Sequence, residues 1–228
     1  MKEKEESRAN IWVYEKLRNQ IENLELAPGL ELNILSLSEE MGVSRSPVRD
    51  ALLRLERDRL VDIFPQRGTR VSYLDYDIIR QERFMRLRLE IGALEACIDK
   101  KRSAEELEAF VTRLRSNLLS QHADLISGEY KSFFAHDDEL HHMFYTEASL
   151  ERVWKVLKAH TGNEHRIRIL SYRSKGIAES VEEDHEALVN AIAKSNKEEA
   201  VKIDTIHLSK LTEEIEALKE QFSKYFTN

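Results

Sequence analysis

The sequence predicts a mostly α-helical protein, with an N-terminal winged helix-turn-helix followed by a C-terminal all-α antiparallel bundle of about six helices. Helical periods and two short strand patterns follow one another in the first 74 residues. All three prolines and three of the seven glycines lie in the first 70 residues, so turns are concentrated there. After residue 74 every long segment has the helical period, which is typical of a helical bundle.

The N-terminal elements are delimited by turn and cap residues. Apolar residues at spacings of three and four predict a first helix that stops before Pro28. Gly42 can adopt the left-handed backbone that ends a second helix, and Ser44 is a good N-cap for a third. Two strand patterns joined by the turn PQRG follow. The expected elements are helices at 8–26, 36–41 and 44–59 and strands at 61–64 and 69–73.

The rest of the chain is expected to form a separate helical domain. We place the domains at 1–74 and 75–228, with a short hinge at 73–77. Short breaks rich in Ser, Gly and Asn separate the helical segments, which favours antiparallel neighbours. The expected helices are 77–101, 104–127, 129–147, 150–173, 178–194 and 197–225.

The composition excludes several classes of protein. No apolar run approaches the length that crosses a bilayer, and the charged first nine residues do not resemble a signal peptide. One cysteine, Cys97, excludes an internal disulfide and fits a reducing compartment, so we expect a cytoplasmic protein with no membrane partner. Cys97 lies in the stretch IGALEACI, which indicates a packing role.

The charge distribution indicates a local anion-binding surface. The net charge is −7, yet residues 41–74 carry seven arginines against four acids, whereas residues 75–228 carry 23 basic and 29 acidic groups. A basic segment attached to an acidic body is consistent with a nucleic-acid-binding domain joined to a domain of another kind.

The helix expected at 44–59 presents a candidate DNA-reading surface. Arg45 and Arg49 are four residues apart and share the face opposite the apolar stripe. Ser44 and Ser46 lie at the same helix end, where backbone N–H groups favour phosphate. The arginine fork can pair with guanine, and a serine hydroxyl suits phosphate or a base edge.

The turn between the two expected strands adds a second candidate contact. Arg67 and Gly68 at its tip would place a cation on the DNA backbone or in the minor groove. The alternative is that the arginines of this region form a solvated face balanced by Asp50, Glu56 and Asp58. The order of helix, glycine turn, serine-capped helix and hairpin favours DNA binding.

The segment HDDELHHMF, residues 136–144, offers two pairs of metal-ligand type. Asp137 with His141, and Asp138 with His142, are each spaced i, i+4 on the expected helix. At 100° per residue the first pair lies at the centre of the apolar arc and the second pair toward its edge. The inward pair is therefore Asp137 and His141.

Two further histidines point inward by the same test, and together with the inward pair they suggest a metal site. His185 lies on a stripe with Leu188 and Ile192, and His207 on another with Ile203 and Leu211. Buried carboxylate and imidazole groups need partners, and a divalent ion would supply one. The alternative for each histidine is a core residue satisfied by a hydrogen bond.

A metal ion at such a site would have open coordination positions, which are compatible with more than one function. One Asp and three His leave room for water or a carboxylate on an ion that takes five or six ligands. A metal-dependent hydrolase would need a general base, and the sequence contains no HExxH. The ion could also be the signal to which the protein responds, or it could serve only to hold the helices together.

The N-terminal region resembles the DNA-binding domain of the GntR family of bacterial transcription regulators. The family pattern is a PG turn, a GVSR-P-VR-AL helix start, a R-LE-GLV helix end and an RG-V wing. This chain has Asp50 where the family commonly has glutamate and Arg59 where it commonly has glycine, and residues 34–36 are more apolar than the family's acidic start. The matching segments are APG at 27–29, GVSRSPVRDAL at 42–52, RLERDRLV at 54–61 and QRGTRV at 66–71.

Residues 78–208 resemble the FCD domain, the helical effector domain of the FadR subfamily of GntR regulators. The resemblance implies a metal site of Asp137, His141, His185 and His207 that holds zinc, nickel or manganese. It also implies a small carboxylate effector on that ion, with Arg86 as a candidate counter-charge or, alternatively, an ion-pair partner of Glu90. The matching marks are Arg86 with Glu90, Asp137 with Leu140 and His141, His185 with Ala191 and Ile192, and His207 with Leu208.

We therefore expect a homodimeric, non-enzymatic transcription regulator, most simply a repressor. Its two winged helices would bind the half-sites of an inverted repeat in double-stranded operator DNA. The effector would change the separation or orientation of the two winged helices.

Overall fold

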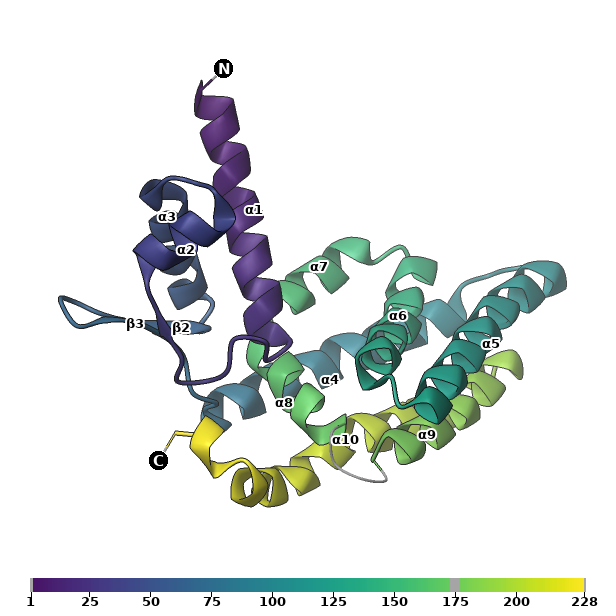
Figure 1. The fold of residues 1–228 in the computed structure, drawn as a ribbon. Coiled ribbons are helices and arrows are strands. Elements are labelled where there is room, and N and C mark those ends of the chain that lie inside the picture. Colours follow the sequence, from purple (N-terminus) through teal and green to yellow (C-terminus); the bar gives the residue numbers. More distant parts are fainter. Residues whose placement is uncertain (1, 173–176, 228) are drawn as a thin grey trace. The chain divides into compact units, whose positions relative to one another are not determined.

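A computed structural model describes residues 2–172 and 177–227 (Figure 1). The chain divides into two compact units. The first unit contains the residues up to Arg80, Ala159–Ile167 and the residues from Lys219 onward. The second unit contains Gln81–Lys158 and Arg168–Leu218. The mostly helical fold class expected from the sequence is confirmed.

The first unit is built on three helices and a three-stranded antiparallel sheet of order β1-β3-β2. In the sheet Val61 pairs with Val71 and Phe64 with Gly68, so β2 and β3 form the expected hairpin, which extends away from the helices of this unit (Figure 1). Strand β1 was not expected, because two residues are too few to show a period. The elements are α1 (Lys2–Glu22), β1 (Glu31–Leu32), α2 (Ile34–Met41), α3 (Arg45–Arg57), β2 (Val61–Phe64) and β3 (Gly68–Val71).

Caps and left-handed residues set the ends of these elements. Asn33 accepts hydrogen bonds from the backbone N–H groups of Leu35 and Ser36, which starts α2 two residues earlier than expected. Gly42 ends α2 with a φ of 64°. Arg59 has a φ of 58°, a left-handed conformation that favours glycine. The glycine common at this position in the GntR pattern therefore has a conformational reason.

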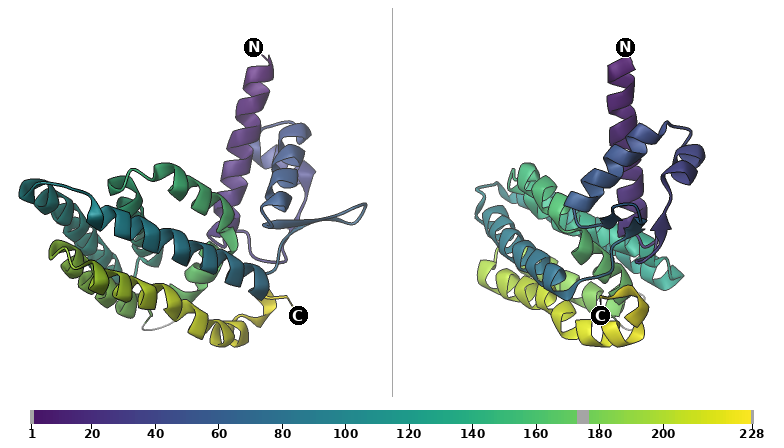
Figure 2. Two further views of the ribbon diagram at one scale, coloured as in Figure 1. Left: turned by 180° about the vertical axis from the view of Figure 1, so that it is seen from behind. Right: turned by 90° about the vertical axis from the view of Figure 1, so that its left-hand side faces the viewer.

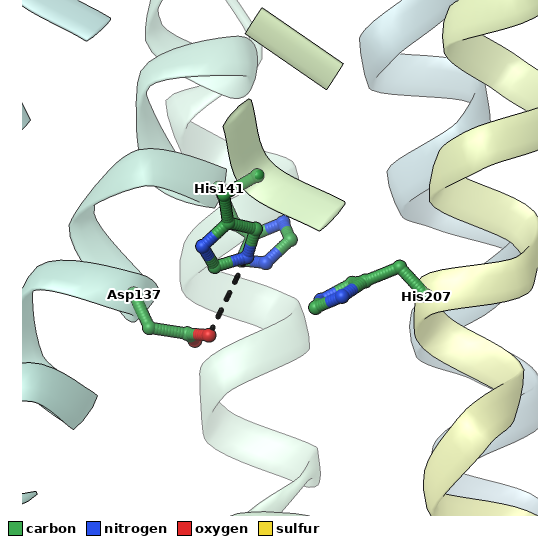
Figure 3. A group of neighbouring side chains, drawn as sticks. Asp137, His141 and His207 are labelled. Atoms are coloured by element: carbon green, nitrogen blue, oxygen red, sulfur yellow. Dashed lines mark ion pairs between the residues drawn. The ribbon is translucent and has the colours of Figure 1, made fainter. Parts of the chain in front are cut away.

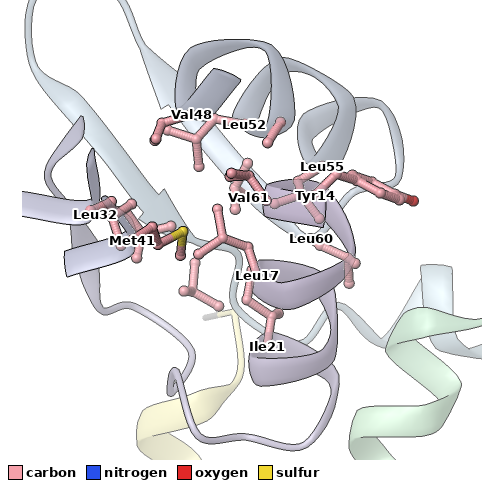
Figure 4. Close-up of a cluster of buried hydrophobic side chains, with 14 residues drawn as sticks. Tyr14, Leu17, Ile21, Leu32, Met41, Val48, Leu52, Leu55, Leu60 and Val61 are labelled. Atoms are coloured by element: carbon pink, nitrogen blue, oxygen red, sulfur yellow. The ribbon is translucent and has the colours of Figure 1, made fainter. Parts of the chain in front are cut away.

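The core of the first unit lies between α1, α3 and the sheet (Figure 4). Helix α1 packs against α3, and Leu17 and Ile21 of α1 are fully buried. Leu52 and Leu55 of α3 meet Leu60 and its neighbours in the same cluster. Burial of this apolar stripe is what holds α3 against α1.

Two segments that are distant in sequence complete the first unit. Arg166 is fully buried and donates from Nη1 to the backbone carbonyl of Ser72 over 2.7 Å. It also donates to the side chain of Asn163. Near the C-terminus, Leu74 and Phe226 form an isolated parallel bridge. These polar contacts explain why short stretches of later sequence belong with the N-terminal residues.

The second unit contains most of the remaining helices, whereas the helix at Gly162–Tyr172 is divided between the two units. Ser103 starts α5 with a capping box that includes Glu106, and Gly128 ends it with a φ of 72°. Helix α5 lies along α6 and α9 (Figures 1 and 2). The helices are α4 (Tyr76–Asp99), α5 (Ala104–Ser127), α6 (Tyr130–Glu147), α7 (Glu151–His160), α8 (Gly162–Tyr172), α9 (Ile177–Ala193) and α10 (Lys197–Gln221).

The prediction of a single helix at 150–173 is wrong. The chain forms α7 and α8 there, and Arg173 lies outside the described residues. The carbonyl of Thr161 accepts the first helical hydrogen bond of α8, from His165. A Cβ on Gly162 would lie 2.9 Å from Oε1 of Glu22 and 3.0 Å from Leu60. The break therefore combines an N-cap threonine with a glycine that permits close packing, and an apolar period does not reveal either feature.

An apolar cluster joins α4, α5, α6 and α9 within the second unit. It contains Leu94, Phe110, Leu140 and Leu188, and Cys97 is buried among them as a free thiol. The packing role expected for Cys97 is therefore confirmed. Along the described residues no helix is long and apolar enough to span a membrane.

Two adjacent leucines of α3 test the role of the first core. Leu52 is buried in the cluster, whereas Leu53 is 44% exposed. We expect Leu52→Ala to lower the free energy of unfolding by about 2–5 kcal/mol and Leu53→Ala to change it by less than about 0.5 kcal/mol. Urea unfolding of the full chain followed by circular dichroism measures both values. Equal losses in the two variants would contradict the assigned core.

Candidate functional site

The first turn of α3 presents a polar surface to solvent. Ser44, Arg45, Ser46 and Arg49 are all exposed. Ser44 is the N-cap residue, yet its side chain makes no capping hydrogen bond with the described backbone. Its hydroxyl and the first N–H groups of α3 can therefore serve an external anion. The helix end combines these donors with two arginine side chains.

The alternative in which neighbouring acids neutralise this surface has little support. Within the described chain neither Arg45 nor Arg49 has an ion-pair partner. Asp50 accepts a hydrogen bond from the side-chain amide of Asn10 over 3.1 Å. Asp58 accepts from the hydroxyl of Tyr14, on the opposite end of α3. The two arginines therefore remain available to an external anion.

The hairpin tip lies in the same unit. Arg67 and Gly68 are exposed at the turn between β2 and β3. Gly68 has a φ of 109°, and a Cβ there would meet no atom within 4 Å, so the backbone conformation alone requires glycine. Helix α3 and the hairpin tip thus belong to one compact unit.

Four residues predicted to ligate a metal lie together in the second unit. Asp137 and His141 come from α6, His185 from α9 and His207 from α10, and each offers a ligand atom within 4.8 Å of the others. Asp137, His141 and His185 are fully buried. Figure 3 shows Asp137, His141 and His207 pointing toward one another. The structure brings the four predicted residues together, and their role as metal ligands stays a prediction.

Two of the imidazole rings are oriented by carboxylates. Nδ1 of His141 forms an ion pair with Oε1 of Glu90, and Nδ1 of His207 lies 3.2 Å from Oδ2 of Asp184. An ionised carboxylate only accepts, so each Nδ1 carries a proton, and in a neutral ring Nε2 keeps its lone pair. Burial opposes the charged form of His141, but the charge of Glu90 raises its pKa overall, so this ring must release a proton from Nε2 before it can bind an ion. Proteins commonly orient metal-ligating histidines in this way.

The third ring is oriented by a chain of amides. Nδ1 of His185 lies 2.8 Å from Oε1 of Gln121, whose amide nitrogen donates to Asn117 over 2.7 Å. Asn117 in turn donates to the carboxylate of Glu139 over 3.3 Å. The carboxylate fixes the direction of every hydrogen bond, because it can only accept. His185 must therefore donate from Nδ1, which leaves the lone pair on Nε2.

The Nε2 atoms fit a metal. Those of His141 and His185 are buried and have no hydrogen-bond partner among the described residues. Nε2 of His185 lies 3.6 Å from Oδ1 of Asp137. A buried unpaired nitrogen keeps the cost of leaving water, about 1–3 kcal/mol, unless another group binds it. Imidazole nitrogens with one carboxylate oxygen suit zinc, nickel or manganese.

The ionisation states also suit a cation. Burial opposes ionisation of Asp137, but the charges of Arg168 and His141 hold its pKa below the usual value. Burial, reinforced by His207, lowers the pKa of His185 well below its usual value. Burial likewise lowers the pKa of His207, although its hydrogen bond to Asp184 opposes the shift. His185 and His207 are therefore neutral near pH 7, as metal ligands must be.

Asp137 has further partners that the sequence did not reveal. Tyr172 donates its hydroxyl to Oδ1 over 2.6 Å, and Arg168 donates to Oδ2. Both residues lie on α8, more than 30 positions from Asp137, so no local pattern links them. Arg168 also donates to Asp138, which Lys158 contacts over 2.6 Å. The Asp137 carboxylate is thus held in place and ionised.

Arg86 forms the ion pair that was the alternative for it. Its Nε donates to Oε2 of Glu90 over 3.1 Å, and both side chains are buried. Burial would raise the pKa of Glu90, but the charges of His141 and Arg86 lower it overall. Glu90 therefore contacts both Arg86 and the imidazole of His141. Contact between Arg86 and an effector stays a prediction.

The other histidines have local roles. His142 stacks on Trp154 at a centroid distance of 4.9 Å. His122 lies 2.8 Å from Glu182, and His136 lies 2.6 Å from Asp124. None of these three belongs to a described cluster of potential metal ligands.

A second polar cluster adjoins the four predicted ligands. Glu90, His141 and Asp204 each offer an atom within 4.8 Å of the others, and all three are buried. Burial and the charge of Glu90 raise the pKa of Asp204 to about 7. Asp204 precedes His207 by one helical turn, which places both on one face of α10. That i, i+3 spacing was the sequence signal that could have revealed Asp204.

Two family models match the chain. Residues 12–71 match the model described as bacterial regulatory proteins of the gntR family, and residues 83–210 match the FCD domain. The first match contains α3 and the hairpin, and the second contains all four predicted metal ligands.

Curated relatives match over nearly the whole chain. An HTH-type transcriptional regulator in an unstable DNA locus of Streptomyces ambofaciens is 31% identical over 94% of this chain and 88% of its own length. The HTH-type transcriptional repressor RspR of Escherichia coli is 25% identical over 96% of this chain and 93% of its own length.

Solved structures share the fold. Escherichia coli McbR/YncC has a TM-score of 0.75 at 18% identity, over 94% of this chain and 98% of its own. Lar, described as controlling expression of the Listeria monocytogenes agr system, has a TM-score of 0.60 at 20% identity, over 92% and 97% of the two chains. The two domain matches and the curated relatives together show that this chain belongs to the GntR family of bacterial transcription regulators and carries an FCD domain.

Proposed function

We propose that this regulator is a homodimeric repressor whose operator binding is controlled by a small carboxylate bound at a metal ion in its helical domain. Residues 1–74 would form the DNA-binding domain, and residues 75–228 the effector-binding and dimerisation domain. The observation that carries the proposal is the convergence of Asp137, His141, His185 and His207, each with a ligand atom within 4.8 Å of the others. RspR, a relative of similar length, is named a repressor.

The proposed DNA contact uses α3 and the wing. Arg45 and Arg49 would pair with base edges in the major groove, while Ser44 and Ser46 would bind phosphate. Arg67 and Gly68 would contact the backbone or the minor groove. Two such units in a dimer would bind the half-sites of an inverted repeat. Support comes from the exposure of all six residues in one compact unit.

The proposed ion is zinc, nickel or manganese. Asp137 would supply an oxygen, and His141, His185 and His207 would each supply Nε2. Bound there, the ion would act as a Lewis acid that attracts a carboxylate to its open positions. The partners of Nδ1, which are Glu90, Gln121 and Asp184, would keep the imidazole rings aligned.

Two different functions of the same site would have different consequences. The metal itself would be the signal if added metal changes operator affinity without any acid. A metal-dependent hydrolase would need a general base, and the observation in its favour is the Asp204 pKa of about 7 beside His141. The appearance of a product when the metal-loaded protein is incubated with candidate ligands would support the hydrolase.

Substitutions in α3 test the DNA contact. Arg45→Ala or Arg49→Ala should weaken specific operator binding by about 5- to 150-fold per half-site, because a bidentate arginine–guanine contact is worth about 1–3 kcal/mol. Fluorescence anisotropy with operator DNA at fixed salt measures the affinity. Arg57→Ala, at the last turn of the same helix, serves as the control and should bind nearly as the wild type. Unchanged affinity in the Arg45 and Arg49 variants would remove the DNA assignment from these residues.

Substitutions around His185 test the ion. Wild-type protein should retain about one divalent ion per chain, and His185→Ala should lose most of it because a ligand is missing. Gln121→Leu should keep the ligand but weaken affinity by about 10- to 100-fold, since the ring loses its orienting acceptor. Elemental analysis and chelator competition measure the two effects.

The neighbouring His142 provides the matched control for the metal test. His142→Ala removes a histidine of the same helix that stacks on Trp154, and it should leave metal content unchanged. One ion per chain in His185→Ala would show that the ligand set is wrong, as would loss of the ion in His142→Ala.

A thermal-shift screen tests the effector. A small carboxylate at about 100 times its Kd should raise the unfolding temperature of the metal-loaded chain by about 5 °C, because binding to the folded state stabilises it by about 2.7 kcal/mol. Chelator should abolish the shift, and the same acid should lower operator affinity. A shift that persists in chelator would place the effector away from the metal.

A further inference from the structure

Asp204 is a buried carboxylate without a visible partner. It lies on α10, and its side chain is 0% exposed. Neither of its carboxylate oxygens has a hydrogen-bond partner among the described residues. Polar groups in protein interiors are almost always paired, because an unpaired group keeps the cost of leaving water. A partner from outside the chain would remove this cost.

The surroundings of Asp204 show which chemistry is missing. Glu90 and His141 each offer an atom within 4.8 Å of it, but these two residues contact one another and Glu90 also accepts from Arg86. The hydroxyl of Tyr145 is buried as well and has no partner within the described chain. The ionised form of Asp204 only accepts hydrogen bonds, so a partner for that form donates one or carries positive charge.

An organic ligand fits this position better than a second ion. A cation shared by Glu90, His141 and Asp204 would have to displace the contact between Glu90 and His141 and lie beside the guanidinium of Arg86. A hydroxyl or ammonium group on a bound molecule displaces neither contact. Because Asp204 has an atom within 4.8 Å of one of His141, a molecule held at the four-residue site would have Asp204 within a few covalent bonds of its anchored end.

We propose that the effector is a carboxylate that also carries a hydroxyl or amino group, and that Asp204 accepts a hydrogen bond from this group. The inference rests on the proposed function, in which the acid binds at the metal site. An unsubstituted acid would exclude water from Asp204 without giving it a partner. Sites with buried polar groups reject such ligands strongly, so Asp204 would determine effector specificity.

The test uses matched acids on the full, metal-loaded chain. The three series are propionate, lactate and alanine; succinate, malate and aspartate; and hexanoate, gluconate and norleucine. Isothermal titration should give at least about tenfold tighter binding for a substituted acid than for the unsubstituted acid of its series. The hydroxy and amino members distinguish a neutral donor from an ammonium group.

Two variants locate the discrimination at Asp204. Asp204→Leu should bind the substituted and unsubstituted acids within about threefold of each other, because the acceptor is gone. Asp204→Asn keeps an acceptor oxygen and a similar shape, so it should retain part of the preference for the hydroxy acid and lose any preference for the amino acid. Circular dichroism and metal content, both expected to match the wild type, verify that each variant is folded and loaded.

Different outcomes would contradict the role of Asp204 and the proposed effector function. Equal wild-type affinities for substituted and unsubstituted acids would overturn the inference and leave the carboxylate effector in place. Discrimination that persists in the Asp204→Leu variant, or in Asp204→Asn if the leucine variant does not fold, would also overturn it. Loss of bound metal in either variant would assign Asp204 to the ion instead. If none of the acids binds, the proposed effector function fails and the inference fails with it.

Discussion

The second unit depends on the pairing of buried charges inside a helical bundle. Glu90 and Asp137 are fully buried, and each is paired with an arginine, Arg86 or Arg168. A buried carboxylate without such a partner would destabilise the fold strongly, so these pairs constrain how α4, α6 and α8 place their side chains. Among the described residues, the Nε2 atoms of His141 and His185 and both carboxylate oxygens of Asp204 are buried without a hydrogen-bond partner. We assign these three groups to ligands.

The first unit has the opposite arrangement, with an apolar core and exposed charged side chains. Its apolar core is closed by Leu17, Leu52 and their neighbours, and its arginines at the start of α3 face solvent. A DNA duplex is too large to enter a protein, so the side chains that bind DNA must be exposed. A small acid, in contrast, can be surrounded by protein side chains. A chain of net charge −7 can therefore also contain a helix whose first turns present arginines to solvent.

Much of the local structure could be predicted from periodicity and caps. The phase of the helix at 129–147 separates Asp137 and His141 from their neighbours, and the burial of both residues agrees with it. The prediction failed at 150–173, where Thr161 and Gly162 divide the segment. The hydrophobic period identifies the inward face of a helix, but it does not detect a helix break that preserves the apolar pattern. The partners of the predicted ligands were missed for another reason, since Gln121 approaches His185 and Arg168 approaches Asp137 from other helices.

The sequence by itself predicted a two-part organisation from the order of its elements, and it predicted the residues on each apolar face and the four candidate ligands from spacing within each helix. Only the tertiary structure decided what each inward polar group contacts. It pairs Arg86 with Glu90, directs Nδ1 of His185 toward Gln121 and leaves Asp204 without a partner among the described residues. The physical reason is that hydrogen bonds between helices depend on packing distances of a few ångströms, which no pattern within a single helix encodes.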